Sequence, residues 1–243
     1  MIAQKTGDKV DYEVASFTNT VANKLHVAYE KISYADIAII CVGESETTAS
    51  EGYDRPTLKL SAPQGNLIIN ASKYNKNLVV VLYTGGAIDV SNLIDKVKGV
   101  VFAGEGVNEA LSSILVGETV PSGKLSETFV YDVKDTATGG SLSDSLTDWY
   151  KEGVFVGYSA YDKFLIGVAF PFGHGLSYAD SVYSNLNIKK CGDTDYTVSF
   201  DIKNTSKVDA KDISQIYVKE LIPCFVRPEK ELKAFSKDLI IAG

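Results

Sequence analysis

"DIAIICVG", residues 36–43, is a short run of nearly continuous apolar side chains that ends at a glycine. Its isoleucines favour a β-strand, and the lack of polar alternation is typical of a strand buried on both faces of a parallel sheet. "NLVVVLYTG" (77–85) and "GVVFAGEG" (99–106) have the same character. The three runs therefore predict parallel strands of one sheet.

Segments with helical spacing stand between and beside these strands. Apolar residues recur at steps of three and four in residues 18–33, which predicts an amphipathic helix. A second helix begins at Pro63, in a first turn that tolerates proline, and a third covers 107–117. Since alternating strands and helices form right-handed parallel crossovers, residues 1–180 are predicted to be an α/β domain: an open, mostly parallel sheet with helices on both faces.

The pattern changes to all-β near the C-terminus. Apolar and polar residues alternate in "YTVSFDIKNTS" (196–206), and a turn separates this run from "AKDISQIYVKEL" (210–221). Such alternation is typical of antiparallel strands with one buried face. A complete antiparallel sandwich takes about 100 residues. Residues 181–243 are therefore predicted to form an incomplete all-β sandwich.

Composition and charge restrict the class of partner. The net charge is −7 and the isoelectric point about 4.9, which argues against nucleic acid and anionic membrane surfaces. No apolar stretch approaches the roughly 20 residues of a membrane-spanning helix. The first residues, "MIAQKTGDKVDYEVASF", lack the basic and apolar segments of a signal peptide, so a cytoplasmic location is expected. A neutral small molecule fits this composition best.

Cysteines and histidines are few and scattered. The three cysteines include no C-x-x-C pair, and their odd number argues against a disulfide framework, so buried free thiols are expected. The two histidines, His26 and His174, stand far apart. Because zinc sites are built from clustered cysteine and histidine ligands, no metal is predicted.

The first predicted strand runs directly into the acidic stretch "ESETTASEGYDRP" (44–56). Loops at the carboxyl ends of parallel strands are where open α/β sheets place their ligands. The stretch could be a solvated loop, or one of its carboxylates could be catalytic. The residues alone leave both interpretations open.

Five segments, in this order along the chain, resemble the C-terminal half of glycoside hydrolase family 3 β-glucosidases and the fibronectin type III-like module that follows it in many members. They cover most of residues 30–240. The segments are "VGESETTASEGYDRPTLKL" (42–60), "VPSGKLSETF" (120–129), "YKEGVFVGYSAYDKF" (150–164), "FPFGHGLSY" (170–178) and "VRPEKELKAFSK" (226–237).

The resemblance implies an activity and a set of site residues. It implies that Glu51, in "SEGYDR", is the acid/base of a retaining hydrolysis of terminal β-linked sugars, and that Asp54 and Arg55 belong to the substrate site. Glu44 and Glu46 are interpreted as solvated or loop-capping. In the family, the nucleophile belongs to an N-terminal barrel that is not found in this chain, so the chain is expected to be inactive without a separate barrel. The face on which a barrel would dock is expected to be exposed and could lead to self-association. No cofactor is implied.

Two alternatives stay open. The chain could be a non-catalytic fragment that serves as a carbohydrate or protein interaction module. It could also be a flavodoxin-like nucleotide binder, because "GEGVNE" (104–109) follows a strand and opens a helix. Glu109 replaces the third glycine of the dinucleotide fingerprint, and its charge would oppose a pyrophosphate. The aromatic segments 155–164 and 170–178 are predicted to pack between the domains rather than to stack on sugars.

Overall fold

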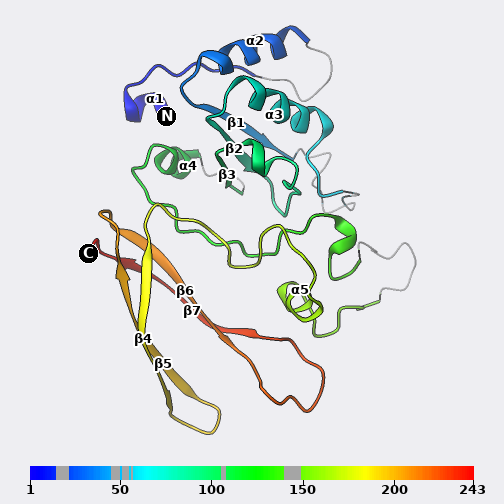
Figure 1. The fold of residues 1–243 in the computed structure, drawn as a ribbon, viewed down its shortest axis with the longest axis vertical. Coiled ribbons are helices and arrows are strands. Elements are labelled where there is room, and N and C mark those ends of the chain that lie inside the picture. The colour runs from blue at the N-terminus through cyan, green and yellow to red at the C-terminus, as the bar shows by residue number, and fades with distance from the viewer. Residues whose placement is uncertain (15–21, 45–49, 51–54, 56, 105–107, 140–148) are drawn as a thin grey trace.

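The computed structural model describes residues 1–14, 22–44, 50, 55, 57–104, 108–139 and 149–243 (Figure 1). Helices and a small sheet form the upper half of the view, and two long hairpins form the lower half. The upper half contains α1 (Ile2–Thr6), α2 (Ala22–Tyr34), β1 (Ala38–Gly43), α3 (Ala62–Tyr74), β2 (Leu78–Tyr83), the short 3-10 helix η1 (Ile94–Lys96), β3 (Gly99–Phe102) and α4 (Asn108–Leu115). The remaining elements are the 3-10 helix η2 (Val133–Asp135), α5 (Tyr158–Phe164), β4 (Ser181–Lys190), β5 (Tyr196–Asn204), β6 (Ala210–Val218) and β7 (Glu231–Ile240).

The sheet of the upper half is parallel throughout, in the order β1-β2-β3. Ile40 lies opposite Val80 on β2, and Val80 lies opposite Val100 on β3. Side chains from β1 and β2 form the centre of the hydrophobic core, which includes Leu78 and Leu82 with almost no exposed surface. The predicted parallel sheet is confirmed.

Helices cover both faces of this sheet. α2 and α3 contact each other and lie on one side of the strands, whereas α4 lies on the other side (Figure 1). α3 has Ser61 at its N-cap and a proline in its first turn, and it buries Ile68 and Ala71 completely against the sheet. Asn75, which follows α3, donates to the carbonyls of Ile32 and Ala35 and so ties the end of α3 to the end of α2.

β1 is buried on one face only, and the predicted burial on both faces is wrong. Its buried residues alternate with exposed ones, and Ile39 and Cys41 face away from the core. The reason is that only one of its faces packs against α2 and α3. Cys41 lies on this outer face and is exposed. Cys191 and Cys224, which lie outside β1, are exposed as well, so the expectation of buried thiols is wrong.

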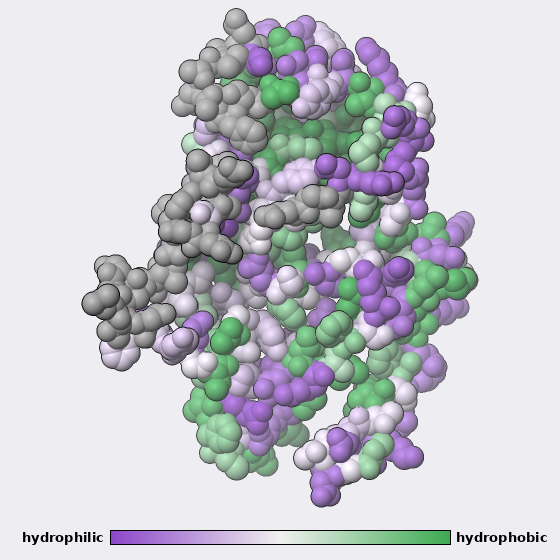
Figure 2. Space-filling model, turned by 180° about the vertical axis from the view of Figure 1, so that it is seen from behind, coloured by the Kyte–Doolittle hydropathy of each residue, from purple (hydrophilic) through white to green (hydrophobic). Residues whose placement is uncertain are grey.

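The lower half consists of two antiparallel hairpins, β4 with β5 and β6 with β7, each forming a separate two-stranded sheet. A bulge interrupts β4 between Ser184 and Asn187, where Asn185 adopts a left-handed conformation and donates to the Asp201 carboxylate. Figure 2 shows apolar side chains at the surface of this half, interspersed with hydrophilic ones. The predicted all-β sandwich is confirmed, although the sequence analysis did not identify β4 and β7 as separate strands.

Aromatic side chains join the two halves. The ring of Tyr158 on α5 stacks on Phe172 and meets the ring of Tyr217 on β6 edge to face. The Tyr158 hydroxyl accepts a hydrogen bond from the Leu232 N–H of β7 at 2.8 Å. The predicted packing of the aromatic segments between the two parts of the chain is thereby confirmed.

Candidate functional site

The carboxyl ends of β1 and β2 bring two polar residues together. Glu44 directly follows β1 and Thr84 directly follows β2, and the Glu44 N–H donates to the Tyr83 carbonyl at 3.0 Å. The Thr84 hydroxyl donates to Glu44 Oε2 and accepts from the Gly86 N–H at 3.3 Å. The carboxylate of Glu44 is thus directed over the start of the loop that follows β2.

Arg55 completes an ion pair with Glu44. Arg55 Nε lies 2.7 Å from Glu44 Oε1, and the two side chains are only 22% and 10% exposed. Arg55 Nη1 also donates to the carbonyl of Ala87 at 3.2 Å. A guanidinium suits this position because its planar fork can donate to a carboxylate and a carbonyl at the same time.

A second carboxylate, Glu127, approaches the same loop from the segment that follows α4. A Cβ atom added at Gly86 would lie 3.6 Å from Glu127 Oε1 and 3.8 Å from Arg55 Nη1, so both side chains border this glycine. The Ala87 N–H donates to the Glu127 carboxylate. The peptide groups of Ala87 are therefore used twice, its carbonyl by Arg55 and its N–H by Glu127.

The two carboxylates differ in their electrostatic surroundings. Glu44 is paired directly with Arg55 and Thr84. For Glu127, burial of the carboxyl group raises the pKa above its ordinary value, and the neighbouring Glu44 charge raises the pKa further. The hydrogen bond from Ala87 and the charge of Arg55 act against this rise.

Of the predicted site residues, the structure describes Arg55. Glu51 and Asp54 lie outside the described residues. Arg55 contacts Glu44 and Ala87, and its predicted contact with substrate stays a prediction. Of the two interpretations of Glu44, solvated or loop-capping, the solvated one is wrong, because its side chain is largely buried beside Arg55. Glu46 lies outside the described residues. Sequence reasoning missed the placement of Glu127, whose signal was its position in "SGKLSETF", a segment already singled out.

Among the described residues, no group of three or more histidine, cysteine, aspartate or glutamate side chains is arranged to hold a metal ion. In the same part of the chain, no helix has the length and apolar character needed to cross a membrane.

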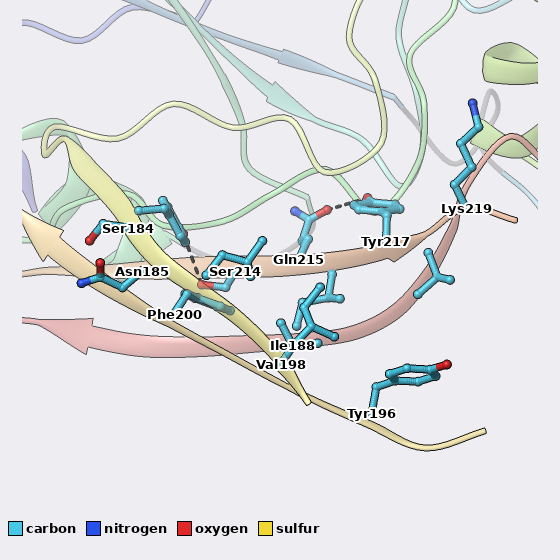
Figure 3. Close-up of a pocket in the computed structure, with 14 residues that line it drawn as sticks. Ser184, Asn185, Ile188, Tyr196, Val198, Phe200, Ser214, Gln215, Tyr217 and Lys219 are labelled. Carbon is cyan, nitrogen blue, oxygen red and sulfur yellow. Dashed lines mark hydrogen bonds between the residues drawn. The ribbon is translucent and has the colours of Figure 1, made fainter. Parts of the chain in front are cut away.

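A separate groove of about 840 Å³ lies between the two hairpins (Figure 3). Apolar side chains of β4 and β5, such as Ile188, Val198 and Phe200, line it on one side. Two of its polar groups bond to each other: Tyr217 donates to Gln215 at 2.6 Å, as a dashed line in Figure 3 marks. Because sugar sites need convergent polar groups, this groove is the apolar inner surface of the hairpins rather than a polar ligand site.

The comparison with known families identifies one match. The sequence model described as "Glycosyl hydrolase family 3 C-terminal domain" matches residues 3–178. This range includes Glu44, Arg55 and Glu127, so the whole charged cluster lies within the matched region.

Two curated relatives show similar identity. The thermostable beta-glucosidase B of Acetivibrio thermocellus is 38% identical over 227 residues, which are 90% of this chain and 30% of the relative. An exo-alpha-(1->6)-L-arabinopyranosidase of Bifidobacterium breve is 36% identical, over 89% of this chain and 29% of the relative. The chain thus spans less than a third of the length of either protein.

Solved structures show the same fold. The GH3 beta-glucosidase of Bifidobacterium adolescentis matches 100% of this chain and 37% of its own with a TM-score of 0.92 and 32% identity. The beta-glucosidase of Kluyveromyces marxianus, solved in complex with glucose, matches 95% of this chain and 28% of its own with a TM-score of 0.87 and 29% identity. Both the α/β half and the hairpins therefore have counterparts in larger proteins.

Proposed function

Because the chain belongs to glycoside hydrolase family 3, we propose that it supplies the α/β part of a β-glucosidase-like enzyme and that Glu51 is the acid/base of a retaining hydrolysis. One observation carries the proposal. The segment that contains Glu51 departs from the carboxyl end of β1 at Glu44 and returns at Arg55, and these two residues form a largely buried ion pair. The segment is thus attached where open α/β sheets place their ligands.

The proposed reaction has two steps. A nucleophilic carboxylate attacks the anomeric carbon while Glu51 donates its proton to the leaving oxygen, and Glu51 then accepts a proton from the water that releases the sugar. The two carboxyl groups must stand about 5–5.5 Å apart for this sequence of events. We propose that the nucleophile comes from a barrel domain, so the chain by itself does not hydrolyse glycosides.

The names of the relatives support a sugar substrate without fixing which sugar. One similar protein is called a beta-glucosidase and another an exo-alpha-(1->6)-L-arabinopyranosidase. These names describe terminal glycosides of different sugars. We therefore propose a terminal glycoside as the substrate class and leave the sugar to the experiment.

The test uses the purified chain and a chimera. The chimera is the Acetivibrio thermocellus beta-glucosidase B in which this chain replaces the region it matches. The chain alone should not release nitrophenol from a nitrophenyl β-glucoside, whereas the chimera should. Glu51→Gln should lower kcat of the chimera by about 10²–10⁴-fold, the usual contribution of a general acid. Glu46→Gln, on the same segment, is the matched control and should keep most activity.

Two outcomes would contradict the proposal. Hydrolysis by the chain alone would show that the nucleophile does not have to come from a barrel. An active chimera in which Glu51→Gln behaves like Glu46→Gln would show that Glu51 is not the acid/base.

The groove between the hairpins favours a second candidate function, a non-catalytic interaction module. Its apolar lining includes Leu186 and Ile188, which are strongly exposed in this chain. A chimera that folds but has no activity, together with a purified chain that binds no gluco-configured inhibitor, would favour this second function over the first.

A further inference from the structure

Three charged side chains meet around one short loop. Glu44 follows β1, Arg55 ends the segment that Glu44 begins, and Glu127 belongs to a stretch about 70 residues further along the sequence. Thr84 holds Glu44, and the peptide groups of Ala87 hold Arg55 and Glu127. The loop after β2 is therefore the common support for all three.

We propose that Glu44, Arg55 and Glu127 form a charged clamp that fixes both ends of the segment 44–55 against the loop after β2, and that Glu127 is a positioning residue for catalysis. The positioning role rests on the proposed function. The clamp itself is a property of this chain and can be tested without any activity.

The ion pair between Glu44 and Arg55 joins the two ends of the segment 44–55. Bringing the two ends of a flexible segment together costs entropy that depends on its length, and a direct contact between the end residues opposes this cost. A largely buried pair is screened less by solvent and salt than an exposed one, and Arg55 is further fixed by the carbonyl of Ala87. An acid/base carried between these ends would thus start from fixed positions, as proton transfer requires.

The net charge of the clamp depends on whether Glu127 is protonated. The charges of Glu44 and Arg55 cancel, so the clamp has a net charge of −1 when Glu127 is ionised and is neutral when Glu127 is protonated. Among the described residues, Tyr161 also faces Glu127, and its pKa is raised mainly by burial. Because the pKa of Glu127 is raised in the folded chain, its proton is lost at a higher pH than in the unfolded chain, and ionisation then opposes folding.

The first experiment observes Arg55 directly. The chain contains only two arginines, Arg55 and Arg227, so a nitrogen-15 spectrum of the arginine Nε–H groups contains two resonances. Arg227 pairs with Glu220 and Glu231 on the surface and serves as the internal reference. We expect the Arg55 resonance to shift with pH about a midpoint above the ordinary pKa of glutamate, and this shift to disappear in Glu127→Gln. The control Glu229→Gln, which removes the surface partner of Lys219, should leave the shift unchanged.

An Arg55 resonance that does not respond to pH, or that responds equally in Glu127→Gln, would overturn the clamp. Because this measurement uses the isolated chain, its outcome does not depend on whether the proposed function is correct. The variant keeps the shape of the side chain and an oxygen that can accept from Ala87, so loss of folding is not expected to obscure the result.

The second experiment tests positioning by the pH dependence of kcat in the chimera. Glutamine resembles the protonated carboxyl group, so Glu127→Gln should match the unsubstituted chimera at low pH. At pH values above the Glu127 pKa, kcat of Glu127→Gln should be about tenfold lower, since small displacements of a catalytic group reduce rates strongly. A uniform loss of kcat at every pH would indicate only a structural role for Glu127 and would overturn positioning. No loss of kcat at any pH would overturn it too. In both cases, activity of the unsubstituted chimera would still support the proposed function.

Discussion

At the residue scale, Gly43 allows the chain to leave β1 toward the candidate site. A Cβ atom at this position would lie 2.0 Å from the carbonyl oxygen of Tyr83, much closer than atoms can approach. The close approach comes from the parallel pairing of Gly43 with Tyr83 at the end of both strands. A glycine is therefore required by the neighbouring backbone, one residue before Glu44.

We predict that Gly43→Ala destabilises the chain by about 1–3 kcal/mol, the usual cost of forcing extra atoms into packed surroundings. Urea unfolding followed by circular dichroism measures this change. Gly65→Ala is the control, because Gly65 lies within α3 and a Cβ atom there meets no neighbour within 4 Å. Alanine should stabilise this helical position by about 0.5–1 kcal/mol. Equal effects of the two substitutions would contradict the role of the Tyr83 carbonyl.

At the element scale, β1 shows how packing overrides sequence character. Ile39 and Ile40 are adjacent and chemically identical, yet Ile40 is 7% exposed and Ile39 is 37% exposed. Ile40 belongs to the core cluster, together with Val80 of β2. The two residues point to opposite faces because the side chains of a strand alternate.

This difference predicts unequal costs for the same substitution. Ile40→Ala should lower the free energy of unfolding by about 2–4 kcal/mol, since it removes buried methyl and methylene groups and leaves a cavity. Ile39→Ala should cost less than about 1 kcal/mol, because little buried area is lost. Urea unfolding of the two variants side by side gives both values. A larger cost at Ile39 would show that the outer face of β1 is covered in solution.

At the scale of the whole molecule, the junction between the α/β half and the hairpins contains both aromatic contacts and an ion pair. Rings of Tyr158, Phe172 and Tyr217 form its apolar part. Lys230 forms an ion pair with Asp162 at 3.1 Å and lies over the ring of Tyr217. Contacts of this kind fix the hairpins to α5, so the two halves should move together.

Tyr158→Phe tests this connection. The substitution keeps the ring contacts but removes the oxygen that accepts from the Leu232 N–H, so it should cost about 1–2 kcal/mol. Hydrogen exchange at Leu232 should become faster, as mass spectrometry of peptides from β7 would detect. Tyr150→Phe, at a residue that is 87% exposed, is the control and should change neither quantity. Unchanged exchange in Tyr158→Phe would show that this bond does not hold the hairpin.

The exposed apolar surfaces of the hairpins lead to a prediction about association. Each hairpin has two strands only, so each keeps backbone edges that are unpaired within the described sheets, beside the apolar groove of Figure 3. We predict concentration-dependent self-association, measured by sedimentation velocity. Ile188→Lys, which places a charge in the groove at an exposed position, should weaken it. A monodisperse monomer at all concentrations would contradict this prediction.

The sequence by itself determined the elements and their class. Apolar runs such as 36–43 are long enough to identify strands, helical spacing identifies the segments between them, and polar alternation identifies the hairpins. It also determined the family, because five ordered segments match one pattern and residues 3–178 fit the family's C-terminal domain. Short α5 was not predicted, since seven residues rich in aromatics give too few helical turns for a periodic signal.

Only the tertiary structure decided which side chains meet. Burial of one face of β1 depends on where α2 and α3 pack, which periodicity within β1 does not encode. The contact of Glu44 with Thr84 arises because β1 and β2 end side by side. The approach of Glu127 depends on chain segments about 70 residues apart. Local patterns determine local structure, whereas electrostatic partners are set by distances in space that only the folded chain defines.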